Sequence, residues 1–280
     1  SKMIIKSFSK INLSLNISRK LKKKSLHDLQ SYFCLINLHD QIRIKKISGQ
    51  KDKVKFQGKF AKYIKKKNSI TNILTVLRER NLISNYYSVI VNKKIPVFAG
   101  LGGGTSNAVY LAKYLTKDNI GKDLLIALEK KIGSDFKLFL QKQGFLENLE
   151  RINNFRKKYK LHFLLVYPKI RCSSRDVYSK VKKYSSKSNF SLKKINSKSR
   201  FIDFLIGKNN DLQLIVTKKH PIIGMIIREI RQNKGCYFSR ITGSGSVCYG
   251  VFKSKKEAFN ALKRVKSKYP KYWFSVAKTI

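Results

Sequence analysis

Four glycines fall within five residues of this chain, in the stretch GLGGG at residues 100–104, although the whole sequence of 280 residues contains only 15. Glycine permits positive φ angles and close approach of the backbone, and each one costs conformational entropy on folding. A cluster of this density therefore demands a tight loop. Thr105, Ser106 and Asn107 follow and are favourable helix N-caps, and apolar residues at helical spacing come after them. We therefore expect a helix to begin beside the loop.

The free N–H groups and the positive dipole end of such a helix would face the glycines, which predicts an anion site and favours phosphate. The sequence motifs of the common phosphate-binding loops do not match this stretch. A P-loop needs a lysine before Thr105, a dinucleotide fingerprint needs glycine at that position, and the HRD and DFG motifs of protein kinases are absent. The alternative is a loop whose glycines only allow a helix to pack closely on a strand. The loop alone does not decide between the two.

Length and composition predict a soluble protein with a substantial core. With 280 residues and 42% hydrophobic content, the chain can form one large or two ordinary domains. No apolar run reaches membrane-spanning length, and the N-terminus lacks the apolar region of a signal peptide. We therefore expect a cytoplasmic protein that does not associate with a membrane. The cysteines are scattered and lack CxxC spacing, which indicates neither a zinc site nor a disulfide framework; they are Cys34, Cys172, Cys236 and Cys248.

The net charge of +47, from 62 Lys+Arg against 15 Asp+Glu, suggests polyanions as partners. The lysines nevertheless run through every segment, together with abundant Ile, Asn, Tyr and Phe, as expected from the codon bias of an A+T-rich genome. Charge of this kind supplies only non-specific affinity for nucleic acid. We therefore expect incidental binding at low salt and no specific nucleic-acid partner, and a basic RNA-binding module remains an alternative.

Hydrophobic periodicity predicts a mixed α+β chain. Expected strands cover residues 8–17, 33–47, 86–91 and 162–167, expected helices cover 69–80, 123–132, 222–232 and 255–269, and a hairpin covers 237–252. A further helix is expected from Asp135, and the polar segment 185–199 is expected to be a mobile surface segment. A basic interval at 153–160 predicts a domain boundary, giving an N-terminal domain at 1–156 and a C-terminal domain at 157–280.

Four segments occur in an order that resembles the GHMP kinases, a superfamily of small-molecule kinases. They are FSKINLSL at 8–15, the glycine loop, IGSDF at 132–136 and ITGSGS at 241–246. The KINL sequence and the motif P-x-x-A-G-L-G-G-G look most like those of the 4-diphosphocytidyl-2-C-methyl-D-erythritol kinases. These kinases belong to isoprenoid precursor biosynthesis by the non-mevalonate pathway. The resemblance spans nearly the full length. It implies a two-domain α+β fold with the active site in the cleft between the domains, ATP bound by residues 1–156 and the substrate side formed by residues 157–280.

The resemblance also implies roles for particular residues. Asp135 would be the general base for the substrate hydroxyl, and Lys10 would lie beside both this base and the transferring phosphoryl group. Mg²⁺ would accompany ATP, with Ser106 as a candidate ligand. The phosphates of ATP would be bound by Pro96, Ala99, Gly100, Leu101, Gly102, Gly103, Gly104, Thr105 and Ser106. These groups suffice chemically, because phosphoryl transfer needs mainly positioning and neutralisation of charge.

On the substrate side, the resemblance implies that His27 hydrogen-bonds cytosine and that a ring at Tyr178 is available for stacking. Asn12, Phe33 and Ser174 are the other implied substrate residues. Here the chain departs from the family, since Lys24-Ser25-Leu26 replaces Asp-Gly-Tyr before the histidine, and Lys137 replaces a proline. The implied reaction is ATP-dependent phosphorylation of the 2-hydroxyl of a cytidine-diphosphate-linked methylerythritol, by a monomer or homodimer.

Each of these residues also has a plainer explanation. Asp135 could cap the helix expected after it, Lys10 could be a solvated strand lysine, and His27 could be an ordinary surface residue. The competing functions are another GHMP kinase of the homoserine or mevalonate type, the RNA-binding module, and a paralogue that binds nucleotide without turnover. The presence of Lys10, the glycine loop and Asp135 argues against the last of these.

Overall fold

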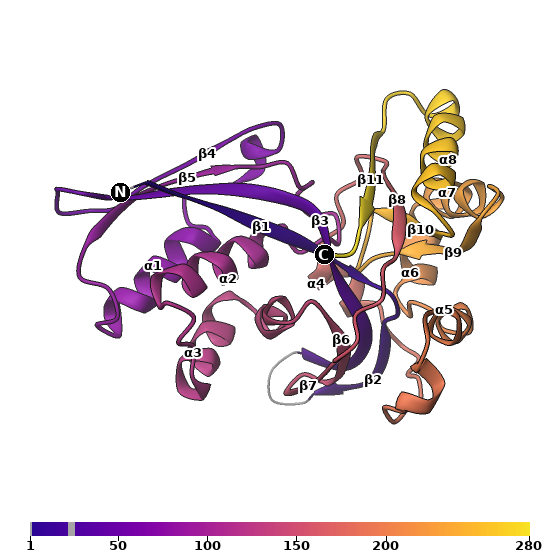
Figure 1. The fold of residues 1–280 in the computed structure, drawn as a ribbon, viewed down its shortest axis with the longest axis horizontal. Helices are drawn as coiled ribbons and strands as arrows, with labels where there is room; N and C mark the ends of the chain where they lie inside the picture. Colours follow the sequence, from indigo (N-terminus) through magenta and orange to yellow (C-terminus); the bar gives the residue numbers. More distant parts are fainter. Residues whose placement is uncertain (1, 22–25) are drawn as a thin grey trace. The chain divides into compact units, whose positions relative to one another are not determined.

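The computed structural model describes residues 2–21 and 26–280 (Figure 1). The chain forms two compact units, and each is built from several separate stretches. Unit 1 comprises Ser1–Ser9, Leu38–Val97 and Gly102–Gln141, and unit 2 comprises Lys10–Asn37, Phe98–Leu101 and Lys142–Ile280. The predicted α+β class with two domains is confirmed. The division into domains at residue 156 stays a prediction.

Unit 1 combines paired strands with helices that lie on one side of them (Figure 1). Residues 41–47 of the long strand β3 (Leu26–Ile47) pair antiparallel with β5 (Tyr86–Asn92), and β4 (Lys53–Gln57) pairs parallel with β5. Strand β1 (Lys2–Asn12) pairs with β3. The helical segments are η1 (Ala61–Tyr63), α1 (Ser69–Glu79), α2 (Gly103–Leu115), α3 (Lys122–Ile132) and η2 (Phe136–Leu140).

Helix α1 is stabilised by a side-chain cap at its start and by a buried apolar face. The Asn68 side chain accepts hydrogen bonds from the backbone of Ile70 and Thr71, and Thr71 completes a capping box. The apolar stripe predicted from sequence is buried, at Ile70, Ile73, Leu74 and Leu77.

Unit 2 contains a four-stranded antiparallel sheet in the order β11-β8-β10-β9, on which helices α7 and α8 pack. The sheet strands are β8 (His162–Tyr167), β9 (Cys236–Ile241), β10 (Cys248–Phe252) and β11 (Trp273–Lys278). The other strands are β2 (Asn16–Leu21), β6 (Gln143–Asn148) and β7 (Arg151–Asn154), where β2 and β6 pair with β3 and β7 pairs with β6. The helices are α4 (Ser174–Ser179), η3 (Leu192–Ile195), α5 (Lys198–Ile206), α6 (Gln213–Lys219), α7 (Pro221–Arg231) and α8 (Lys255–Lys268).

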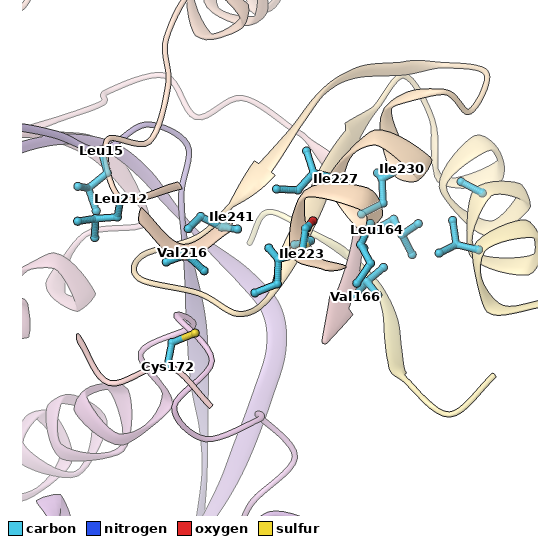
Figure 2. Close-up of a cluster of buried hydrophobic side chains, with 14 of the residues drawn as sticks. Leu15, Leu164, Val166, Cys172, Leu212, Val216, Ile223, Ile227, Ile230 and Ile241 are labelled. Carbon is cyan, nitrogen blue, oxygen red and sulfur yellow. The ribbon is translucent and has the colours of Figure 1, made fainter. Parts of the chain in front are cut away.

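The core of unit 2 lies between this sheet and its helices (Figure 2). Ile223 and Ile230 of α7 are fully buried against Leu164 and Val166 of β8. The hairpin strand β9 contributes Ile241 to the same cluster. This packing fixes the hairpin whose turn carries the TGSG sequence, and the predicted hairpin is confirmed by the pairing of Ile241 with Cys248.

Several local predictions are corrected. The strand expected at 8–17 ends at Asn12, because the N–H groups of Leu13 and Ser14 both turn to the Tyr32 carbonyl. The helix expected after Asp135 is the single 3₁₀ segment η2.

The segment 185–199, predicted to be a mobile surface segment, is tied to strand β3 and contains η3. Gln30 bonds Ser188 in both directions, through Nε2 to the carbonyl at 3.0 Å and through Oε1 from the N–H at 2.9 Å. Among residues 2–21 and 26–280, no helix has the length and apolarity needed to cross a bilayer.

Candidate active site

The second half of the glycine loop belongs to unit 1 and opens helix α2. Gly102 is the N-cap in the left-handed region at φ 67°, and the helix begins at Gly103. The prediction that Thr105, Ser106 or Asn107 caps this helix is therefore wrong, since all three lie inside it. Because a glycine cap has no side chain to accept from the first turn, the N–H groups of that turn remain suited to an anion.

The first half of the loop belongs to unit 2 and is held by the TGSG turn. Val247 donates its N–H to the Ala99 carbonyl at 3.0 Å, and Thr242 donates Oγ1 to the Gly100 carbonyl at 3.2 Å. Gly100 has φ +88°, and a Cβ there would lie 2.0 Å from the Thr242 carbonyl oxygen. Only glycine fits this contact, so the turn supports the loop and is more than a connection between two strands.

Lys10 lies against this same region of unit 2. It is 7% exposed, its backbone N–H donates to the Leu101 carbonyl at 3.0 Å, and its Nζ donates to the Asn12 side chain. Asn12 is fixed in turn, because its N–H donates to Thr242 Oγ1 and its Nδ2 donates to Ser31 Oγ, both at 2.9 Å. The structure thus excludes the solvated strand lysine considered for Lys10 and places a buried cation beside the glycine loop.

Asp135 lies in unit 1, two residues after Gly133, the C-cap of α3. Its side chain makes no capping hydrogen bond to the 3₁₀ segment that follows, which removes the plainer explanation for an acid at this position. Thr105 Oγ1, in the first turn of α2, donates to Asp135 Oδ1 at 3.4 Å. A Cβ on Gly133 would lie 3.0 Å from the same oxygen. The glycine therefore leaves room for the carboxylate beside the start of α2.

His27 and Tyr178, the predicted cytidine pair, come together in unit 2 with ring centroids 5.2 Å apart. Burial, followed by the nearby charge of Lys20, lowers the pKa of His27, so the imidazole is neutral at pH 7. Ser174 lies near the glycine loop, because its Oγ contacts Ser244 Oγ in the TGSG turn at 2.9 Å. Lys24 and Ser25 of the departing segment lie outside the described residues.

Other predicted site residues are buried supports. Phe33, Leu101 and Ser106 are fully buried, and Pro96 and Ala99 are buried as well, so none of these side chains is presented to a ligand. Ser106 Oγ donates to the Phe8 carbonyl and contacts Ser7 Oγ at 2.9 Å. These contacts occupy the hydroxyl, and it does not suit a metal ligand. In the described part of the chain, no group of three or more His, Cys, Asp or Glu side chains could hold a metal ion.

Two features were missed by sequence reasoning. Phe98 has φ 56°, an uncommon conformation for an aromatic residue, is 50% exposed, and lies two residues before Gly100. Unit 1 also contains a cavity of about 850 Å³, whose lining includes Asn68, Thr71 and Arg78. Ser69, next to Asn68 of this lining, has its Oγ 3.9 Å from where a Cβ on Gly104 would lie, so a residue beside the cavity lies near the first turn of α2. No spacing motif marks these residues.

Comparison with known proteins gives consistent matches. The family model for the GHMP kinase C-terminal region matches residues 195–271. A 4-diphosphocytidyl-2-C-methyl-D-erythritol kinase of Pelagibacter ubique is 34% identical over 281 residues, covering 99% of this chain and 98% of that protein. The enzyme of the same name from Finegoldia magna is 29% identical and covers 97% and 98%.

Solved structures show the same fold. A crystal structure of 4-(cytidine 5'-diphospho)-2C-methyl-D-erythritol kinase has a TM-score of 0.74 at 20% identity and covers 98% of this chain and 99% of that one. Homoserine kinase from Cytophaga hutchinsonii has a TM-score of 0.69 at 13% identity, with coverage of 100% and 94%. The predicted resemblance is confirmed.

Proposed function

Because this chain belongs to the 4-diphosphocytidyl-2-C-methyl-D-erythritol kinase family of GHMP kinases, we propose that it transfers the γ-phosphoryl group of ATP to the 2-hydroxyl of that cytidyl alcohol. The observation that carries the proposal is the position of the Asp135 carboxylate. Its carboxylate caps no helix and contacts Thr105 in the first turn of α2, so the predicted base and the predicted phosphate loop meet within one unit. This is the juxtaposition that phosphoryl transfer to an alcohol requires.

In this mechanism, the N–H groups at the start of α2 bind the phosphates of ATP, and the 850 Å³ cavity of unit 1 accepts the nucleoside. Asp135 accepts the proton of the substrate hydroxyl as its oxygen attacks phosphorus. Lys10, held by Asn12, supplies a fixed positive charge for the transferring group. Mg²⁺ would enter bound to the phosphates of ATP, where it would neutralise part of their charge.

The test is ADP release with Mg²⁺-ATP across a panel of the cytidyl methylerythritol, homoserine and mevalonate. We expect turnover with the first compound only. A better rate with homoserine or mevalonate would leave the phosphoryl-transfer chemistry in place and exclude the cytidyl substrate. Absence of turnover with all three, in a protein that still binds ATP, would favour a paralogue without activity.

His27→Ala and Tyr178→Ala are each expected to raise KM for the cytidyl substrate about 10-fold while KM for ATP stays within twofold. The neutral imidazole and the phenol ring contact each other, and losing one polar or stacking partner of a base costs about 1–3 kcal/mol. Steady-state kinetics with each substrate varied in turn measures the effect. Unchanged KM values in both variants would remove the pair from the cytidine site.

Binding of RNA is expected to behave as a polyelectrolyte effect of the +47 charge, in a cytoplasmic monomer or homodimer. Affinity should fall steeply between 50 and 200 mM salt, by about 10³-fold or more if six or more phosphates are contacted, with no preference for sequence. Filter binding of unrelated RNAs at several salt concentrations measures this. An RNA that resists competition at physiological salt would instead support a specific nucleic-acid function.

A further inference from the structure

A fully buried ion pair lies in unit 1 outside the groups assigned above. Asp40 of β3 and Lys93, directly after β5, are 0% and 1% exposed in their side chains, and Lys93 Nζ lies 2.5 Å from Asp40 Oδ2. Replacing a buried ion pair by well-packed apolar residues is often neutral or stabilising, so such a pair is weak evidence for stability alone. Its contacts indicate what else it does.

The Asp40 carboxylate gathers donors from the segment that leads into the glycine loop. Its Oδ1 accepts the backbone N–H groups of Lys94 at 2.6 Å and Ile95 at 2.9 Å. Its Oδ2 accepts from Asn107 Nδ2 at 3.1 Å in addition to Lys93. One carboxylate therefore holds the chain before the loop and the second turn of the helix after it.

The same contacts continue to strand β1. Lys93 Nζ also donates to Asn107 Oδ1 at 3.1 Å, and Asn107 Nδ2 donates to Ser7 Oγ at 2.8 Å. Ser7 contacts Ser106, whose hydroxyl donates to the Phe8 carbonyl. These bonds explain why Ser106 and Asn107 are buried polar residues on the inner face of α2.

The ion pair also lies directly beside the start of the helix. A Cβ placed on Gly103 would be 3.3 Å from Lys93 Nζ and 3.1 Å from the Ile95 side chain. Gly103 is the first residue of α2, whose N–H groups we propose to bind phosphate. A displacement of Lys93 or Ile95 would therefore move the phosphate-binding turn itself.

We propose that Asp40 is a positioning residue for nucleotide binding, with Lys93 as its buried countercharge, and that it sets the distance between the two ends of the glycine loop. The inference rests on the proposed function, since it presumes that the loop binds ATP. Asp40 touches no ligand in this role. Small errors of position have large effects in an active site, where a displacement of about 1 Å can lower the reaction rate about 10²-fold.

The test is titration of a non-hydrolysable ATP analogue into wild type, Asp40→Asn and Asp40→Ala, with thermal melting of the same samples. Asparagine keeps one acceptor oxygen for Lys94 and Ile95, and alanine keeps none. We expect the dissociation constant to rise roughly 10-fold in Asp40→Asn and up to about 100-fold in Asp40→Ala. KM for ATP should rise in parallel, while KM for the cytidyl substrate stays unchanged.

The control is Ile44→Ala, which removes a buried apolar side chain from the same strand and lowers the melting temperature without touching the ion pair. Its nucleotide affinity should match wild type. Lys93→Met gives a second variant if the aspartate variants unfold, because it leaves Asp40 three donors and should weaken the affinity less than Asp40→Asn.

The outcomes distinguish a failure of the proposed role of Asp40 from a failure of the proposed function. Folded Asp40 variants with wild-type nucleotide affinity would overturn the inference and leave the proposed function intact. If the aspartate variants unfold, wild-type nucleotide affinity in a folded Lys93→Met protein would likewise overturn it. Wild type that fails to bind the analogue would overturn the proposed function, and the inference with it.

Discussion

Replacing Asp135 by asparagine is expected to lower kcat by at least about 10²-fold, the usual contribution of a positioned general base. The amide has the shape of the carboxylate and retains an oxygen that can accept from Thr105 Oγ1, so the start of α2 should keep its structure. It cannot take a proton from the substrate hydroxyl. Nucleotide affinity should therefore stay within a few-fold of wild type, and the loss should appear in kcat and kcat/KM together.

Single-turnover phosphorylation measures the chemical step, and titration of an ATP analogue measures binding. Asp123→Asn is a matched control, since it removes the same charge from an exposed acid in the first turn of α3. It should turn over like wild type. Near-normal turnover in Asp135→Asn would place the base elsewhere, and equal losses in both variants would indicate a general effect of net charge.

The parts of the fold that sequence predicts well are those in which local signals agree. Strand β8 matches the predicted residues 162–167, α1 and α8 differ from their predicted bounds by one residue at the C-terminal end, and α7 is shifted by one residue at both ends. In each of these three helices, periodic apolar residues coincide with a cap or a proline at the start. Strands β4, β7 and β11 were missed because they are short or half-exposed, so their patterns are weak.

The start of α2 shows where a local rule failed. Three good N-cap residues follow the glycines, yet Gly102 is the cap, since Ser106 and Asn107 bond Ser7, Phe8 and Asp40 from inside the helix. Those partners lie about 70 to 100 residues away in sequence, and nothing in a window around the loop encodes them. Tertiary contacts decided the helix start.

In the candidate site too, some features are suggested by the sequence and others are visible only in the structure. The glycine loop, Asp135 and the TGSG turn could be predicted because the resemblance rests on them. The pairing of Asp40 with Lys93 could not, since 53 residues separate them and Lys93 is one among 62 basic residues. Phe33 was assigned to the substrate because it matches an aromatic of the family, and burial of its ring in the core is visible only in three dimensions.

Gly100→Ala is expected to have the second largest effect, because this glycine has no space for any side chain. The residue lies at φ +88°, and a Cβ would come within 2.0 Å of the backbone oxygen of Thr242. A flexible side chain could yield, but this oxygen belongs to a buried turn whose Thr242 and Ser246 are fully buried. Either the loop or the turn must shift, with a backbone strain of about 1–3 kcal/mol in addition to the lost bonds.

Because Thr242 also bonds Asn12, whose side chain accepts from Lys10, the displacement should reach both the loop and Lys10, the lysine proposed to act on the transferring group. We expect nucleotide affinity to fall about 10-fold or more and kcat to fall as well, with a lower melting temperature. Gly207→Ala is the matched control in unit 2, since its Cβ would make an ordinary 3.6 Å contact at a φ of −78°. Calorimetric titration and melting of both variants measure the effect. A folded Gly100→Ala protein with wild-type affinity and turnover would show that the contact between loop and turn is not needed for phosphate binding, and the case for the loop would then depend on α2 alone.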